Sequence, residues 1–499
     1  MSSTPPPIRH ARRPGDRWRR LALGLLLCLP CAAPAMPASP TEEPLLVKAG
    51  AVIDGTDRPP LRNAWVLIQG GSIVSVGKPG SFPVPSQVAV LRAPGCTLLP
   101  GLIDAHVHLV ASGIVGYTFL RPQPRGHEVF LRNLRAELLG GVTLVRDLHM
   151  SVSIAHRLED ALREDPASGA RFIYAGPVLT VPGGYRTSFD APIASAEEGR
   201  QWVEQLAREG AGVIKVAVTS RGLGRVGVSF VPIDADILQA IVDEAHRRGL
   251  PVAAHVAGAT AADLREAVEA GVDSLEHMPG ESGPLDPPDL FYSTSGLLPD
   301  ILRKGITIVP TLSVVAGEDF GPTLPDLLDD PALLLKLSPD QREILRENRG
   351  DFARSPDRQA IASAGKQRMA LYLEEVRRLH QAGVRLGAGS DAGSGMTFHG
   401  NLFTEIQYLH EGGLTPLEAI QAATRGNADL LRVSRLQGTV EPGKRADLLL
   451  VRGDPLRDLA ALRRVEKVII AGRIVDVRGL LKGAVRNERK KKRAAPSPP

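Results

Sequence analysis

The sequence contains little cysteine, which argues against a fold held together by disulfides. Only three cysteines occur in 499 residues. Cys28 and Cys31 lie in an apolar run near the N-terminus, and Cys96 lies alone in the rest of the chain. Once the N-terminal run is removed from the mature protein, no internal disulfide can form, and the stability must come from packing.

The N-terminal apolar run is too short for a comfortable membrane span. Leu21–Leu29 falls well below the roughly 20 residues that a spanning helix needs. Six arginines precede this run, and Ala33–Ala35 follows it with small residues. The pattern predicts a cleaved signal peptide at residues 1–35 and a periplasmic or secreted protein that has no stable membrane span after processing. A retained N-terminal anchor is the alternative, and twin-arginine export stays open beside ordinary secretion.

The body of the chain lacks the positive charge that nucleic-acid binding requires. The net charge is +5, but residues 1–35 carry +5 and residues 482–499 carry +6, so the body carries −6. This balance argues against a nucleic-acid partner and leaves a small molecule or a short peptide as the expected ligand. The basic segment 481–499 is expected to be a disordered tail, with contact to a membrane surface as the alternative.

The middle of the chain alternates between strand-like and helix-like runs, which is typical of parallel βαβ units. Amphipathic runs such as Glu197–Glu209 and Ala261–Ala270 separate eight expected strands. The eight are Cys96–Leu109, Val142–Leu148, Arg171–Ala175, Val213–Val218, Val252–His255, Ser274–His277, Ile306–Thr311 and Val384–Gly389. The sequence therefore predicts an α/β fold with a (β/α)8 TIM barrel at residues 99–436.

Both ends of the body carry short β-like runs separated by turn residues. Neither residues 45–98 nor residues 437–480 could form a stable sheet alone, because isolated hairpins are marginal. We expect them to join into one discontinuous β-sandwich domain. Within the barrel, residues 313–364 form a long helical insertion after the seventh strand, which predicts a lid over the site. An exposed insertion without a role is the alternative.

Polar residues occur at the ends of several predicted strands, where barrel enzymes place their chemistry. His106 and His108 are two residues apart, so both rings point to one side of a strand and can reach one metal ion. Later strands end with Lys215, His255, His277 and Asp391. Read singly, each histidine could be an ordinary core residue, but the ordered set indicates a metal site.

This order of residues resembles the amidohydrolase superfamily of metal-dependent barrel hydrolases. The resemblance implies two divalent ions, with zinc as the expected metal. It places His106, His108 and Asp391 on the first ion, His255 and His277 on the second, and a carbamylated Lys215 between them. It also implies that a hydroxide shared by the two ions attacks the substrate carbonyl while Asp391 carries the proton as general acid and base.

Further motifs are similar to the imidazolonepropionase-like branch, which contains Xaa-Pro dipeptidases. The resemblance rests on Gly176-Pro177, Gly183-Gly184 and the segment 414–419, and it implies cleavage of an amide bond in a dipeptide or an N-acyl amino acid. Cyclic-amide or amine hydrolysis is the alternative reaction, and a catalytically inactive scaffold is the non-enzymatic one. Tyr185 and Ser220-Arg221 depart from the residues common in relatives.

Four residues are predicted to contact the substrate. Arg221 and Arg225 follow the strand of Lys215, where a guanidinium can hold a substrate carboxylate. Tyr185 lies after the Gly-Gly pair, and His399 opens the helix after the eighth strand as a second catalytic candidate. Surface capping is the alternative for His399. The sequence leaves the oligomeric state open, and a homo-oligomer is compatible with it.

Overall fold

The computed structural model describes residues 43–111, 126–185, 190–221, 229–279, 294–320, 336–337, 341–342, 346, 358–476 and 479. The predicted signal peptide, Arg225, most of the helical insertion and the basic tail 481–499 lie outside these ranges. Among the helices in the described ranges, none combines the length and apolar character that a bilayer span requires.

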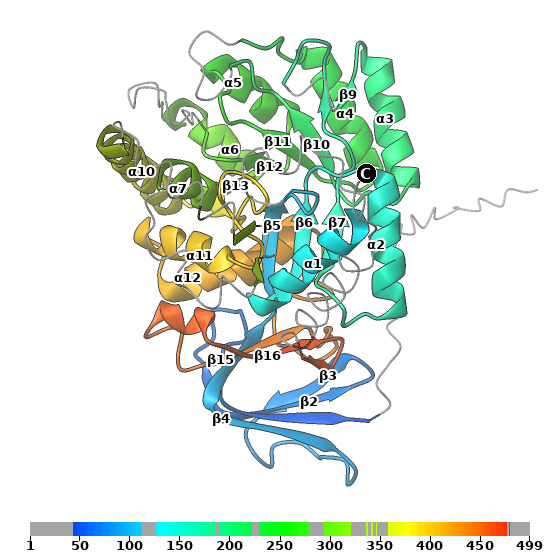
Figure 1. The fold of residues 1–499 in the computed structure, drawn as a ribbon, viewed down its shortest axis with the longest axis vertical. Helices are drawn as coiled ribbons and strands as arrows, with labels where there is room; N and C mark the ends of the chain where they lie inside the picture. Colours follow the sequence, from blue (N-terminus) through cyan, green and yellow to red (C-terminus); the bar gives the residue numbers. More distant parts are fainter. Residues whose placement is uncertain are drawn as a thin grey trace, which may run out of the picture. The chain divides into compact units, whose positions relative to one another are not determined.

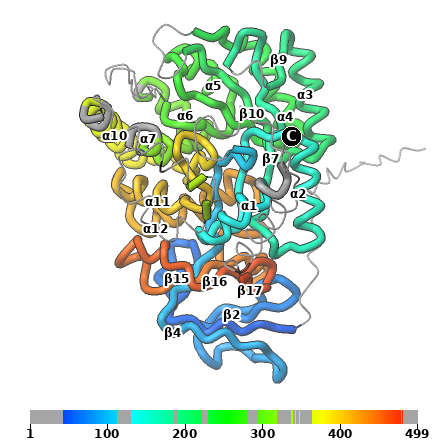
Figure 2. Tube along the Cα trace, in the orientation of Figure 1, coloured from blue at the N-terminus to red at the C-terminus, as the bar shows by residue number. Residues whose placement is uncertain are grey.

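Both ends of the body meet in one seven-stranded sheet with the order β17-β16-β15-β4-β1-β2-β3. The blue and the orange-red segments of Figure 2 lie together in this β domain. Its strands are β1 (Leu45–Val52), β2 (Leu61–Gln69), β3 (Ser72–Gly77), β4 (Ala89–Pro100), β15 (Leu448–Arg452), β16 (Val465–Ile470) and β17 (Arg473–Val475). The prediction that the two ends join in one sheet domain is confirmed, and the finer prediction of a β-sandwich stays a prediction.

The first predicted barrel strand, Cys96–Leu109, is two strands in the structure. β4 ends at Pro100 in the β domain, and β5 (Leu102–Val107) begins the barrel. Gly101 lies between them because a Cβ there would collide with the side chain of Thr143. The glycine therefore lets one continuous segment pass from the β domain into the barrel.

Eight parallel strands form the centre of the second domain, and helices surround them (Figure 1). After β5 they are β6 (Val142–Asp147), β7 (Arg171–Tyr174), β10 (Ile214–Ala217), β11 (Val252–His255), β12 (Ser274–Glu276), β13 (Thr307–Val309) and β14 (Arg385–Leu386). Two short strands, β8 (Leu179–Thr180) and β9 (Ala191–Pro192), follow β7 in the chain and extend the sheet beside β10 in the order β10-β8-β9. All eight predicted barrel strands are thus found, in the expected order.

Backbone contacts link the first strand to the last. Val107 of β5 forms a parallel bridge with Ala392, which follows β14. Further down, the side-chain amide of Asn427 donates to the carbonyls of Ile103 and Ala388, both at 2.7 Å. The chain after β14 therefore lies beside β5, as the (β/α)8 architecture requires.

The helices cover the strands and bury one large apolar core against them. They are α1 (Gly126–Leu139), α2 (Val152–Glu164), α3 (Ala196–Arg208), α4 (Ala235–Arg247), α5 (Ala261–Ala270), α6 (Leu298–Lys304), α7 (Leu312–Phe320), α10 (Arg358–Gln381), α11 (Leu402–Glu411), α12 (Pro416–Gln421) and α13 (Asn427–Leu430). The ends of α5 follow from helix-capping residues in the sequence. Thr260 and Asp263 form a capping box at its start, and Gly271 ends it with a φ of +86°.

Candidate active site

The six residues predicted to hold metal all line one pocket of about 120 Å³ at the carboxyl ends of the strands. His106 lies in β5, Lys215 in β10 and His255 at the end of β11. His277 and Asp391 follow β12 and β14. Parallel strands bring residues from distant parts of the sequence to the same end of the barrel, which is why these six converge.

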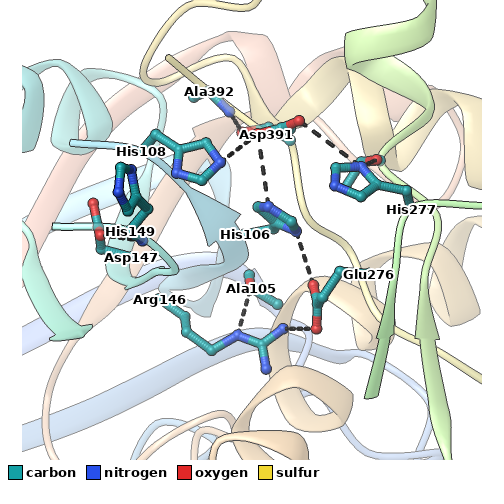
Figure 3. A network of polar contacts seen from close by, with 12 residues as sticks. Ala105, His106, His108, Arg146, Asp147, His149, Glu276, His277, Asp391 and Ala392 are labelled. Atoms are coloured by element: carbon teal, nitrogen blue, oxygen red, sulfur yellow. Dashed lines mark hydrogen bonds and ion pairs between the residues drawn. The ribbon is translucent and has the colours of Figure 1, made fainter. Parts of the chain in front are cut away.

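Three of the six form a tight cluster. One ligand atom from each of His106, His277 and Asp391 lies within 4.8 Å of the others. His108 joins through Asp391, because its Nε2 lies 3.1 Å from Asp391 Oδ1 (Figure 3). His106 Nε2 lies 3.7 Å from the same oxygen. Asp391 is therefore the carboxylate on which the histidines converge.

A buried chain of polar contacts orients His106 (Figure 3). Its Nδ1 lies 2.8 Å from Glu276 Oε2, and Arg146 Nη2 donates to Glu276 Oε1 at 2.6 Å. Arg146 also donates through Nε to the carbonyl of Ala105 at 2.5 Å. With Nδ1 held by Glu276, the Nε2 of His106 faces Asp391. A carboxylate behind a histidine in this way is the usual support for a metal-binding imidazole.

The charge states of the cluster suit a divalent metal. Burial lowers the pKa of His106 to about 4, and it also lowers the pKa of His277, so both rings are neutral near pH 7. Burial alone would raise the pKa of Asp391, but His106 and His108 outweigh it and hold the pKa below its usual range. Neutral imidazoles beside an ionised carboxylate are the donors that zinc and related ions bind. The residues present therefore fit a metal.

Comparison with known proteins accounts for this arrangement. Residues 97–475 match the family described as the amidohydrolase family. This chain belongs to the amidohydrolase family. It is accordingly a metal-dependent hydrolase that acts on carbon–nitrogen bonds, as the order of site residues predicted.

Several amidohydrolases resemble the chain along most of its length. The ochratoxinase of Aspergillus niger is 29% identical over 461 residues, covering 85% of this chain and 84% of that protein. The imidazolonepropionase of Streptomyces griseus is 23% identical over 400 residues, covering 80% and 88%. A solved Xaa-Pro dipeptidase with methionine bound in its active site is 26% identical, covers 87% of this chain and 99% of its own, and gives a TM-score of 0.67.

Three residues at this amidohydrolase's strand ends have positive φ although none is glycine. They are His277 at 75°, Thr311 at 51° and Asp391 at 53°. A β-branched residue such as Thr311 is strained in this conformation, and strain of this kind gathers at functional sites. Thr311 Oγ1 lies 2.8 Å from His277 Nδ1. Thr311 ends the predicted strand Ile306–Thr311, but a threonine there gave no signal of a site role, because its hydroxyl is neither a usual metal ligand nor an acid or base.

The predicted substrate residues divide into two groups. Tyr185 lines the pocket, and its ring stacks on His255 with centroids 4.6 Å apart. His399 is buried elsewhere: Nδ1 lies 2.8 Å from Glu137 Oε1 and Nε2 lies 3.3 Å from the carbonyl of Ala111. Arg221 is half-buried after β10, and His399 and Arg221 are both absent from the pocket lining that the described residues form.

The pocket also includes His149, a residue for which the sequence indicated no role. His149 follows β6, and its Nε2 lies 2.7 Å from the buried Asp190. Two residues earlier, Asp147 accepts from the backbone N–H groups of Leu109 and His149 at 2.6 and 2.9 Å. Asp147 thus braces the barrel rim.

Proposed function

We propose that this amidohydrolase cleaves an amide bond in a small peptide-like substrate, a dipeptide or an N-acyl amino acid. One observation carries the proposal: all six strand-end residues of the ordered set line a single small pocket, and Asp391 lies at its centre. The names of two similar proteins, ochratoxinase and Xaa-Pro dipeptidase, support an amide substrate. Similarity to imidazolonepropionase keeps cyclic amides as the second candidate.

In this proposal His106, His108 and Asp391 hold one divalent ion, and His255 and His277 hold a second. Lys215 is buried in β10 and lines the same pocket. A buried lysine ammonium is unfavourable, and carbamylation would turn it into an anion able to bridge two ions. The bound ions, zinc in our proposal, would lower the pKa of water and polarise the substrate carbonyl.

Asp391 performs the proton transfer in the same proposal. Its low pKa keeps it ionised at neutral pH, so it can accept a proton from the attacking water. The proton then passes to the leaving nitrogen, which would otherwise depart as an unstable anion. The contact of 3.1 Å with His108 holds the carboxylate at the place where both transfers occur.

The pocket walls suit a small substrate with one apolar side chain. Leu148, Val178, Ala257 and Val314 supply apolar surface, and Tyr185 supplies an aromatic face. We assign a substrate carboxylate to Arg221, whose Nε is buried without a hydrogen-bond acceptor among the described residues. Arg225 is proposed as its partner from the sequence. His399 stays a proposed site residue that would donate to a substrate carbonyl or carboxylate, although its ring nitrogens lie against Glu137 and the carbonyl of Ala111 in this structure.

A panel of dipeptides, N-acyl amino acids and cyclic amides tests the proposal directly. Zinc-loaded wild-type protein should release amine from the first two groups, and Asp391→Asn protein should release it about 10³- to 10⁴-fold more slowly. Hydrolysis confined to cyclic amides would favour the second candidate. An absence of hydrolysis from a protein that binds no metal would overturn both.

The proposed location follows from the N-terminus alone. We propose that residues 1–35 direct export and are removed, so that the enzyme acts in the periplasm or outside the cell. Sequencing the N-terminus of exported protein checks this. A start near Met36 supports it, and an intact Met1 contradicts it.

A further inference from the structure

Glu405 is a buried carboxylate to which the proposed chemistry assigns no role. It lies on α11, the helix after β14, and its side chain is fully buried. Oε2 accepts from the backbone N–H of Ser313 at 2.8 Å and lies 2.7 Å from the Ser313 hydroxyl. Oε1 has no hydrogen-bond partner among the described residues. Burying a carboxylate with so few partners is unfavourable, so its presence calls for an explanation beyond packing.

Ser313 connects Glu405 to the two strand ends that carry the metal cluster. It comes two residues after Thr311, whose hydroxyl lies 2.8 Å from His277 Nδ1. Its own hydroxyl lies 3.2 Å from the carbonyl of Ser390, the residue before Asp391. Ser390 is held from the other side by Asp104, to which its hydroxyl donates at 2.5 Å. The Glu405 carboxylate is therefore connected through Ser313 to two places: the segment that contacts His277 and the residue before Asp391.

Both strand ends need support, because both contain strained backbone. Thr311 and Asp391 have φ values of 51° and 53°, which residues with a Cβ disfavour. Such conformations persist only where the surroundings hold them in place. The bonds from Ser313 to Glu405 fix the chain immediately after Thr311, and the contact with Ser390 fixes the chain immediately before Asp391.

We propose that Glu405 is a positioning residue for the metal centre. Through Ser313, Glu405 holds the end of β13 against the end of β14. At the end of β13 this fixes the position of Thr311 relative to His277. At the end of β14 it fixes the position of Asp391 relative to the two histidines of β5 and its end. The inference rests on the proposed function, since it assumes that His277 and Asp391 bind metal. If it holds, Glu405 helps to set the positions of the metal ligands although it lies outside the pocket lining that the described residues form.

The structure offers a matched control for this arrangement. Glu375 on α10 is also a buried carboxylate that accepts from the backbone N–H and the hydroxyl of one residue, Thr294, at 3.1 and 2.8 Å. It is absent from the pocket lining and from the metal cluster that the described residues form. Loss of Glu375 therefore reports what loss of a buried carboxylate, together with its ion pair to Arg378, does to stability.

Cobalt(II) binding provides the test, because the visible spectrum of cobalt reports the geometry of its ligands. We expect Glu405→Ala to weaken cobalt binding by about 10- to 100-fold, to alter the spectrum, and to lower kcat with KM changed less than about threefold. Glu405→Gln keeps an acceptor for Ser313 and should restore most of the binding. Glu375→Ala should lower the Tm and leave cobalt affinity and spectrum unchanged.

Ser313→Ala is the second variant in case Glu405→Ala fails to fold. It removes only the hydroxyl, and we expect the same spectral change in a milder form. If Glu405→Ala and Ser313→Ala bind cobalt with the wild-type spectrum and affinity, Glu405 has no positioning role. If the wild-type protein itself binds no cobalt, the proposed metal site fails instead, so the two failures are distinguishable.

Discussion

The β domain and the pocket end of the barrel place charged side chains differently. The β-domain core is an apolar cluster that includes Val47, Val66 and Leu98, and Arg452 and Glu466 pair on its surface. The pocket end instead buries Arg146 against Glu276. Burying a charged pair removes both groups from water, which costs free energy that an apolar pair of the same size would not cost. We infer that the pocket end gives up stability for a defined arrangement of side chains, whereas the β domain is built for stability.

The largest expected effect comes from Asp391, the carboxylate at the centre of the pocket. Asp391→Asn keeps the size of the side chain but removes its charge and its ability to accept a proton. We expect kcat to fall by about 10³- to 10⁴-fold, measured by amine release from the best panel substrate. As a control, Asp454→Asn changes a carboxylate of the β domain that pairs with Arg62 at the surface, and it should leave kcat unchanged. Activity within tenfold of wild type in Asp391→Asn would remove Asp391 from the proton transfer.

Replacement of Lys215 should lower the rate nearly as much and should also change the amount of bound metal. Lys215→Ala removes the proposed bridge, so bound metal should fall from about two ions to about one per chain, and the rate should fall by about a thousandfold. Added acetate or propionate should restore part of the rate in Lys215→Ala but not in Asp391→Ala. Two bound ions and near-normal turnover would show that Lys215 is only a buried strand lysine and would favour one-metal chemistry.

The Arg–Glu pairs test the comparison between the two regions most directly. The side chains of Arg146 and Glu276 are 1% and 0% exposed, whereas those of Arg452 and Glu466 are 68% and 38% exposed. Glu276→Gln leaves the Arg146 guanidinium buried without a counter-charge, so the free energy of unfolding should fall by about 3 kcal/mol or more. Glu466→Gln should lower it by less than about 1 kcal/mol. Urea unfolding measures both, and equal losses would refute the contrast.

These buried pairs also mark the limit of what the sequence predicted. The eight strands and the six pocket residues followed from local alternation and from the order of polar residues at strand ends. The roles of Arg146, Glu276 and Glu405 could not be predicted in this way, because their partners are far away in the sequence and no spacing rule relates them. For Arg146 and Glu276 a signal was present, namely a charged residue inside an apolar strand run. The break at Gly101 escaped prediction because the collision that requires glycine involves Thr143 on another strand.

The free energy of unfolding should depend on pH because of Glu405. Burial raises its pKa to about 7, and the charge of Asp391 adds to this. Because the folded protein holds this proton more tightly than the unfolded chain, the free energy of unfolding should decline as pH rises from about 4.5 to 7 and then level off, by about 3 kcal/mol in total. His106 acts in the opposite direction over part of this range, so the measurement is a difference between variants.

Urea unfolding of metal-free wild-type and Glu405→Gln protein at pH 5 and pH 8 gives that difference. Relative to wild type, Glu405→Gln should gain stability between the two pH values, because glutamine cannot ionise. Glu375 is a suitable comparison, since the bonds from Arg378 and Thr294 outweigh burial and lower its pKa. Glu375→Gln should therefore show no such gain. A Glu405→Gln difference that does not change with pH would mean that Glu405 titrates normally.

The smallest expected effect is on substrate affinity and concerns Arg221. Arg146 is buried and paired, so it serves the structure. Arg221 is half-buried, its Nε has no acceptor among the described residues, and we propose that it binds a substrate anion. Arg221→Met should raise KM for carboxylate-bearing substrates by roughly tenfold, the loss of one charge-assisted bond, with kcat and Tm nearly unchanged. Amidated analogues of the same substrates should show no such rise, because they carry no charge for the guanidinium to bind. Equal rises for both substrate types would mean that Arg221 shapes the pocket without recognising the carboxylate.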